Sequence, residues 1–202
     1  MTMTAPRPHD LLVVHRPAAF ACDGARPDWL DPAAPLVVRR ETAAPGIVPV
    51  GARGLQRNER CKGYLAQADA ASVITPRMLA ARARTAESDL PCIAALRALA
   101  PRLDALGVDW GPAGGAGYWL ACGLPVLRTT SDLDLLVRLP HRPPAALVDA
   151  LCALQEGQPC RLDIQADTGA GGFALAEYAR GGRVLLKTGD GPRLVADPWE
   201  AA

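Results

Sequence analysis

The 202 residues give the chain enough length for one large domain or two small ones with a sizeable core. A formal net charge of +1, from 22 basic and 21 acidic residues, excludes binding to nucleic acid or membranes through bulk electrostatics. An anionic ligand must therefore be held by local basic clusters. No apolar stretch is long enough to cross a bilayer. From the charge balance and this absence, we expect neither a nucleic acid nor a membrane as a partner.

The six cysteines are scattered and form neither a Cys-x-x-Cys pair nor a cluster with histidine at zinc-binding spacing. The N-terminal segment lacks the basic start and apolar run of a signal peptide. We therefore expect a cytoplasmic protein whose cysteines stay reduced and form no disulfide.

The first part of the chain is predicted to form short strands at 11–14, 36–39 and 47–51. Pro49 is expected to confine the third strand to the edge of a sheet, because proline cannot donate a ladder hydrogen bond. Thr75 followed by a proline is typical of a capped helix start. His9, beside a proline, is expected at the surface.

A domain boundary near residues 85–90 would divide the chain into an N-terminal domain, 1–87, and a C-terminal domain, 88–202. The second domain opens with a helix in which Pro101 should cause a kink or a break. Its further helices are expected at 117–122 and 144–155, and its strands at 107–110, 132–138, 161–165 and 183–187. The fold class is therefore α+β, with a small N-terminal α+β domain followed by a domain with a mixed sheet flanked by helices.

The stretch 131–137, Ser-Asp-Leu-Asp-Leu-Leu-Val, carries the most information about function. Alternate side chains of a strand point to the same face, so Asp132 and Asp134 should project together. Two neighbouring carboxylates repel each other unless a cation neutralises them. Their hard oxygen atoms suit Mg²⁺, which also bridges to substrate phosphates. The pair predicts a magnesium-dependent enzyme that acts on a nucleotide or polyphosphate.

A third carboxylate and a glycine pair extend this site. Asp163 should lie on the polar face of strand 161–165, and three carboxylates converge if that strand neighbours 132–138. Such a group suits phosphoryl or nucleotidyl transfer. Upstream, a turn at Gly114 and Gly115 would let backbone N–H groups approach a phosphate, and the helix N-terminus behind it favours negative charge.

Basic side chains form the remaining candidates for substrate binding. Arg53, Arg57 and Arg60 recur at helical spacing and would share one side if a helix forms there. Together with Lys62 they suit a phosphate or an acidic partner surface, whereas a charged run is more often a solvated face. Lys187 either meets a phosphate from a strand end or lies in solvent. The pattern alone leaves both choices open.

A glycine pair before a helix, Asp-x-Asp on a strand and a later third aspartate resemble the nucleotidyltransferase superfamily. Trp110-Gly111, Gly123-Leu124-Pro125 and Ser131-Asp132-Leu133-Asp134 resemble, more narrowly, the malonate decarboxylase holo-[acyl-carrier-protein] synthase family of phosphoribosyl-dephospho-CoA transferases. The resemblance continues, in order and over nearly the whole chain, through His9-Asp10-Leu11, Pro35–Arg40, Pro49–Arg60, Arg161-Leu162-Asp163 and Val184–Thr188.

The resemblance implies a nucleotidyltransferase-like C-terminal domain and transfer of the phosphoribosyl-dephospho-CoA group from triphosphoribosyl-dephospho-CoA to a serine. The acceptor would be the acyl carrier protein subunit of malonate decarboxylase, and pyrophosphate would leave. Asp132 and Asp134 would hold Mg²⁺, and Asp163 would complete the metal site or act as the base. The substrate would be bound by Gly114, Gly115, Ser131, Arg53, Arg57, Arg60 and Lys187. The family usually carries serine where this chain has Gly115, so one hydroxyl contact to phosphate is absent.

Two other functions fit the same residues. One is a different magnesium-dependent nucleotidyltransferase, which transfers AMP to a small molecule or a protein. The other is a non-catalytic binding module of the same fold, for example an antitoxin-like partner, although a module without activity has no reason to keep repelling carboxylates together. Magnesium-dependent thermal stabilisation by dephospho-CoA compared with ATP distinguishes the three.

Overall fold

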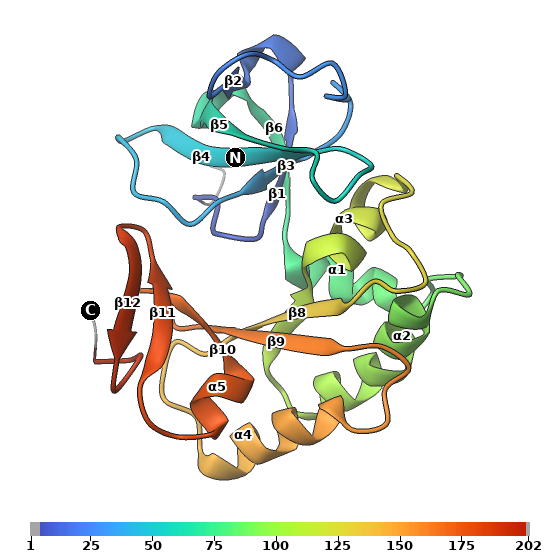
Figure 1. Ribbon diagram of the computed structural model, residues 1–202, viewed down its shortest axis with the longest axis vertical. Helices are drawn as coiled ribbons and strands as arrows, with labels where there is room; N and C mark the ends of the chain where they lie inside the picture. The colour runs from blue at the N-terminus through green and yellow to red at the C-terminus, as the bar shows by residue number, and fades with distance from the viewer. Residues whose placement is uncertain (1–4, 201–202) are drawn as a thin grey trace.

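The computed structural model describes residues 5–200 and contains two sheets of six strands each (Figure 1). Residues 1–4 and 201–202, the outer ends of the two predicted domains, lie outside the described residues. Helices accompany both antiparallel and parallel strand pairs, so the α+β class is confirmed. Within the described residues, no helix has the length and apolar character needed to cross a membrane.

The first sheet is antiparallel throughout, in the order β2-β5-β4-β3-β1-β6. Its strands are β1 (Leu11–Val14), β2 (Ala21–Cys22), β3 (Leu36–Val38), β4 (Ile47–Arg53), β5 (Arg60–Ala66) and β6 (Ala70–Ile74), with short 3₁₀ helices at Pro17–Ala19 and Gln67–Asp69. Strand β5 shows why this segment is a strand: Cys61, Gly63 and Leu65 are buried, while the residues between them are exposed. This period of two places one face on the core.

The expectation that Pro49 marks an edge strand is wrong, because β4 lies between β5 and β3. The Pro49 carbonyl accepts a hydrogen bond from Arg39 at 2.8 Å, just beyond the last residue of β3. In an antiparallel pair the nitrogen and carbonyl of one residue point to the same neighbour. The missing N–H of Pro49 therefore faces a position where β3 has already ended, and no ladder bond is lost.

The expectation of six reduced cysteines is also wrong, because the structure contains a disulfide between Cys22 and Cys61. The short strand β2 pairs with β5 so that Cys22 lies opposite Gly63, two residues from Cys61 on the same face. The two cysteines are 39 residues apart in sequence, and only this non-local pairing brings them together. The remaining four cysteines are free.

Two helices connect the sheets. Helix α1 (Pro76–Ala83) begins as predicted, with the Thr75 hydroxyl accepting a hydrogen bond from the Met78 N–H at 3.2 Å. Helix α2 (Pro91–Ala105) is not broken at Pro101 and continues to its end as one element. Its buried face consists of Cys92, Ile93, Ala95, Leu96, Leu99, Ala100 and Leu103. The packing of this face outweighs the single hydrogen bond that proline removes.

The second sheet is mixed, in the order β12-β11-β10-β9-β8-β7, with β8 and β9 as its parallel pair. Its strands are β7 (Asp109–Pro112), β8 (Leu133–Arg138), β9 (Leu162–Asp167), β10 (Gly172–Ala174), β11 (Val184–Thr188) and β12 (Gly191–Val195). The helices are α3 (Gly114–Cys122), α4 (Ala145–Cys152), which ends in a 3₁₀ turn at Ala153–Gln155, and α5 (Leu175–Ala179). Figure 1 shows α4 and α5 below this sheet, and α1 and α3 on the side that faces the first sheet.

A buried ion cluster joins the two sheets. Asp167, at the end of β9, accepts hydrogen bonds from Arg40 at 2.9 Å and from Arg138 at 3.2 Å. Arg138, at the end of β8, also lies 3.5 Å from Asp10, and both carboxylates are buried. Removing one partner would leave a buried charge without compensation, so these contacts hold the two sheets in a fixed arrangement.

His9 lies beside this cluster and is not the surface residue that the sequence suggested. Burial and, to a smaller extent, the neighbouring charge of Arg40 lower the pKa of its imidazole to about 4, whereas Asp167 opposes the shift. Arg138 and Lys187 also act to lower this pKa. His9 is consequently neutral in the folded protein at neutral pH.

His9→Asn is expected to make the protein less sensitive to mild acid. Between about pH 6.5 and 4 the unfolded chain binds a proton that folded His9 does not, so the native protein loses stability as the pH falls through this range. The loss from this group is at most about 3 kcal/mol, at roughly 1.4 kcal/mol per pKa unit. Asparagine tolerates the positive φ of 74° at this position but does not titrate. The measurement is the difference in unfolding free energy between variant and native protein from pH 4 to 8; a difference independent of pH would contradict the prediction.

Candidate active site

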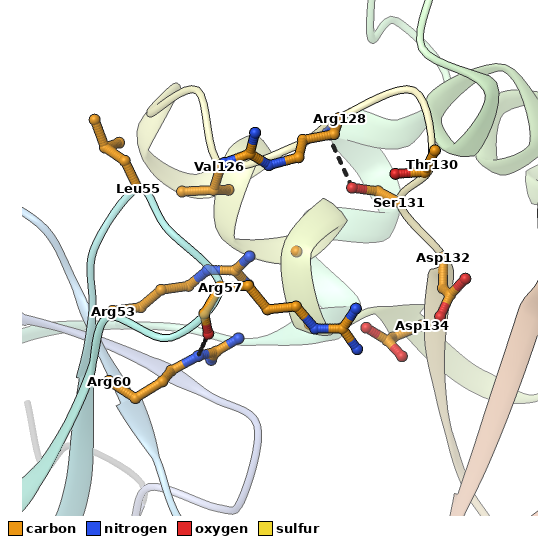
Figure 2. Close-up of a pocket in the computed structure, with 12 residues that line it drawn as sticks. Arg53, Leu55, Arg57, Arg60, Val126, Arg128, Thr130, Ser131, Asp132 and Asp134 are labelled. Atoms are coloured by element: carbon orange, nitrogen blue, oxygen red, sulfur yellow. Dashed lines mark hydrogen bonds between the residues drawn. The ribbon is translucent and has the colours of Figure 1, made fainter.

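A cavity of about 250 Å³ opens where the β4–β5 hairpin of the first sheet meets the second sheet (Figure 2). Three segments form its walls: the hairpin, the start of α3, and the loop that leads into β8. Its lining consists of Arg53, Leu55, Arg57, Arg60, Gly114, Gly115, Val126, Arg128, Thr130, Ser131, Asp132 and Asp134. The cavity therefore combines four arginines with two carboxylates.

The hairpin brings together the three arginines that the sequence suggested as a cluster. Arg53 ends β4 and is paired directly across the ladder with Arg60, which begins β5, while Arg57 lies in the turn. The helix considered as one possibility for this segment does not form; the Gly54 N–H donates to the Glu59 carbonyl at 3.0 Å and closes the hairpin instead. Figure 2 shows these arginines on the hairpin side of the cavity, with the strand that carries Asp132 and Asp134 on the opposite side.

Arg53 is the most enclosed of these arginines. Its guanidinium carbon lies 5.7 Å from the centre of the Tyr118 ring, a cation–π arrangement, and the Tyr118 hydroxyl donates to the Arg53 carbonyl at 3.3 Å. Burial lowers the pKa of the Arg53 guanidinium from its ordinary value, while nearby Asp134 acts in the opposite direction. Arginine stays charged under such shifts, so Arg53 presents a fixed positive charge to the cavity.

Two of the three predicted carboxylates, Asp132 and Asp134, line the cavity, and the third, Asp163, lies on the neighbouring strand. Strands β8 and β9 run parallel with Asp134 directly opposite Asp163, and Asp132 lies just before β8. Burial raises the pKa of Asp134, and the negative charges of Asp163 and Asp132 raise it further. Arg53 and the backbone N–H of Gly115 lower it. Within residues 5–200 none of the three carboxylates forms an ion pair.

The donor set of this site fits magnesium. Asp132 and Asp134 line the same cavity and offer only oxygen atoms, and no cationic side chain neutralises them by direct contact in the part of the chain that the structure describes. Across the same residues, no three His, Cys, Asp or Glu side chains gather into a metal-binding group. Mg²⁺ is commonly held by one or two carboxylates together with water and substrate phosphates, and this pair meets that need. The three-carboxylate ligand set with Asp163 stays a prediction.

Gly114 is required by the close approach of α3 to β8. The residue begins the helix with φ of 52°, and a Cβ atom there would lie 1.8 Å from a carboxylate oxygen of Asp134. At Gly115 a Cβ atom would lie 2.9 Å from the tip of Leu127 and 3.6 Å from the Arg53 guanidinium. The N–H groups at this helix start, which have no partner within the helix, therefore lie beside the carboxylates, where they can also meet a phosphate oxygen.

The loop into β8 supplies the predicted Ser131 and also residues that the sequence analysis missed. The Ser131 hydroxyl accepts a hydrogen bond from the Arg128 N–H at 2.9 Å, and this contact holds the turn before β8. The Arg128 guanidinium donates to Gln56 of the hairpin at 2.6 Å and so links two walls of the cavity. A basic residue a few positions before Asp-x-Asp is the signal that would have found it. Val126, Thr130 and Leu55 have no comparable signal.

Lys187 is the one predicted substrate-binding residue that the structure does not bring into this cavity. It is exposed on β11, opposite Gly172 and Pro192, and thus three strands away from β8 in the sheet. A role for Lys187 in substrate binding stays a prediction.

Paired carboxylates on a strand, a helix start at two glycines and arginines opposite them are together typical of an enzyme site that acts on a phosphate-bearing substrate. The N-terminal domain model of the phosphoribosyl-dephospho-CoA transferase MdcG matches residues 7–76, and the C-terminal domain model matches residues 78–198.

Curated relatives match over nearly their full length. The phosphoribosyl-dephospho-CoA transferase of Pseudomonas aeruginosa is 44% identical, over 98% of this chain and 95% of the relative. Those of Pseudomonas putida strain W619 and Klebsiella pneumoniae strain 342 are 45% and 38% identical, each over 97% of the relative and at least 97% of this chain. No solved structure matches. The chain belongs to the phosphoribosyl-dephospho-CoA transferase family, as the sequence resemblance predicted, and it is a transferase.

Arg57→Ala is expected to weaken binding of inorganic tripolyphosphate by roughly 10- to 100-fold, the effect of losing a charged hydrogen bond of about 1.5–3 kcal/mol. Arg57 is exposed in the hairpin turn and lines the cavity, so its removal should leave the thermal unfolding temperature unchanged. Titration calorimetry measures the affinity, with Arg180→Ala, an exposed arginine at the end of α5, as the control. Equal affinities of the two variants would show that Arg57 does not bind phosphate.

Proposed function

We propose that the enzyme transfers the phosphoribosyl-dephospho-CoA group from triphosphoribosyl-dephospho-CoA to a serine of the apo acyl carrier protein subunit of malonate decarboxylase. The observation that carries this proposal is one cavity in which arginines of the hairpin face Asp132 and Asp134 across the start of α3, in a member of this transferase family. The relatives are phosphoribosyl-dephospho-CoA transferases, which supports the assignment of the transferred group, and the charges in the cavity support a site for its phosphates.

The basic and acidic residues of the cavity have different roles in this proposal. Arg53, Arg57 and Arg60 bind the triphosphate, and the N–H groups at the start of α3 bind one of its oxygens. A magnesium ion held by Asp132 and Asp134 would neutralise charge on the phosphates during transfer.

The proton of the attacking serine is assigned to Asp163. The serine oxygen forms a bond to the phosphorus attached to the ribose, the bond from that phosphorus to the outer two phosphates breaks, and pyrophosphate leaves. Asp163 accepts the hydroxyl proton, because it is partly exposed and lies directly opposite Asp134 on the neighbouring parallel strand.

The test is the intact mass of the apo carrier protein after incubation with the enzyme, Mg²⁺ and triphosphoribosyl-dephospho-CoA. We expect a mass gain equal to the phosphoribosyl-dephospho-CoA group and one pyrophosphate released per carrier. A carrier whose acceptor serine is changed to alanine should gain nothing. No gain with folded enzyme and intact donor would overturn the acceptor assignment.

A second assay separates this function from transfer of AMP. In the presence of Mg²⁺, 3′-dephospho-CoA should raise the thermal unfolding temperature of the enzyme more than ATP does. A larger effect of ATP would favour the alternative nucleotidyltransferase.

A further inference from the structure

A second cavity, of about 210 Å³, adjoins the proposed phosphate site. The two cavities share Arg53, Arg60 and Gly114, so these residues form the wall between them. The second cavity is otherwise lined by His9, Leu11, Val37, Leu79, Pro112, Ala113, Gly117 and Tyr118. It differs from the first in being mainly apolar and in having no carboxylate among its lining residues.

Both sheets contribute to this second cavity. Leu11 of β1 is paired with Val37 of β3 on one side, while Leu79 of α1 and Tyr118 of α3 lie on the other. Leu79 and Tyr118 are fully buried, so two of its walls are fixed by packing. An apolar slot of this kind with an aromatic ring suits a flat ring system.

His9 adds a polar group to these walls. Its backbone holds a positive φ of 74°, which is uncommon for a residue other than glycine, and its N–H donates to the Val38 carbonyl at 3.1 Å. No described residue forms a hydrogen bond with its imidazole. Because the lowered pKa keeps the ring neutral, it offers one N–H donor and one nitrogen acceptor to a ligand.

We propose that the second cavity binds the adenine ring of the donor while the first binds its triphosphate. This assignment rests on the proposed function, since the donor is the molecule in which a base and a triphosphate are joined through two riboses. The base can then lie on one side of Arg53 and Arg60 and the phosphates on the other. The volume is below the roughly 300–1,000 Å³ that encloses a drug-sized ligand, so the cavity takes one ring system and not the pantetheine arm as well.

The test uses Val37→Trp, which places a large side chain in the cavity from a half-buried position on β3. We expect 3′-dephospho-CoA to bind at least about tenfold more weakly, the size of effect seen when stacking of one base is lost, and tripolyphosphate to bind as before. Val73→Trp is the matched control, because Val73 is a half-buried valine of β6 that lines neither cavity.

A second variant keeps the test independent of how well the first one folds. His9→Gly suits the positive φ and removes the imidazole. The native enzyme should prefer AMP to IMP, which differs in the base alone, and the variant should lose that preference. If Val37→Trp instead weakens 4′-phosphopantetheine and leaves AMP unaffected, the cavity belongs to the pantetheine arm and the proposal is overturned. If AMP binding depends on Val37 but the carrier protein is never modified, the cavity assignment holds and the proposed acceptor falls.

Discussion

Asp134→Asn is expected to lower the transfer rate by roughly 10²- to 10⁴-fold without lowering the thermal unfolding temperature. The carboxylate lines the cavity together with Asp132, and burial together with the charges of Asp163 and Asp132 raises its pKa. Its negative charge is therefore unfavourable to the folded protein when no cation is bound. The amide has nearly the same shape and relieves that repulsion, so stability should be unchanged or increased.

In the proposed mechanism the rate falls because the variant loses a carboxylate that would hold the magnesium ion, and with it the neutralisation of charge on the phosphates. Such contributions amount to several kcal/mol, and each ~1.4 kcal/mol is a factor of ten in rate. The measurements are single-turnover transfer and thermal unfolding with and without Mg²⁺, with Asp149→Asn, an exposed aspartate of α4, as the control. The native enzyme should be stabilised by Mg²⁺ and the Asp134 variant should not. A variant that unfolds at a lower temperature, or that still responds to Mg²⁺, would contradict a metal-binding role.

The carboxylate strands could be predicted because their signal is local. Leucine and aspartate alternate from Asp132 onward, and Asp163 lies between Leu162 and Ile164, so period-two burial places each aspartate on the polar face. The helix between the two strands permits a parallel crossover, and the register then sets Asp134 opposite Asp163. The sequence predicted this proximity on the condition that the two strands are neighbours, and the structure shows that they are.

The first sheet was harder to predict because its features depend on pairing between distant segments. Arg53 and Arg60 at helical spacing are also compatible with a tight hairpin, and exposed charges do not distinguish the two. The disulfide depends on a two-residue strand, β2, that has no sequence signal of its own. Pro49 is tolerated inside the sheet only because its neighbour strand is short, which no single-strand pattern reveals.

Gly114→Ala is expected to reduce transfer about as strongly as loss of Asp134 itself, and also to destabilise the protein. A methyl group at this position would overlap the Asp134 carboxylate, with 1.8 Å to Oδ2 and 3.0 Å to Cβ. Because the Cβ atom of Asp134 as well as its carboxylate oxygen would be too close to the new methyl group, Asp134 must leave its place in the cavity. A misplacement of about 1 Å in a reacting group costs on the order of 10²-fold in rate. The left-handed backbone adds ~1–2 kcal/mol of strain for a residue with a Cβ atom.

Gly115→Ser is the matched variant at the neighbouring position, and it should stay active within a few-fold of the native rate. Its Cβ atom would meet only the tip of Leu127 at 2.9 Å, and a terminal methyl can move aside. The new hydroxyl would lie near the Arg53 guanidinium, 3.6 Å from the Cβ position, where it can contact a phosphate. The measurement is the transfer rate and unfolding temperature of both variants. An equal loss of transfer rate at the two positions would mean that the close approach of Gly114 to Asp134 does not position the carboxylate. A loss of rate confined to Gly114 would show that the glycine pair has two distinct roles: backbone clearance at the first position and phosphate contact at the second.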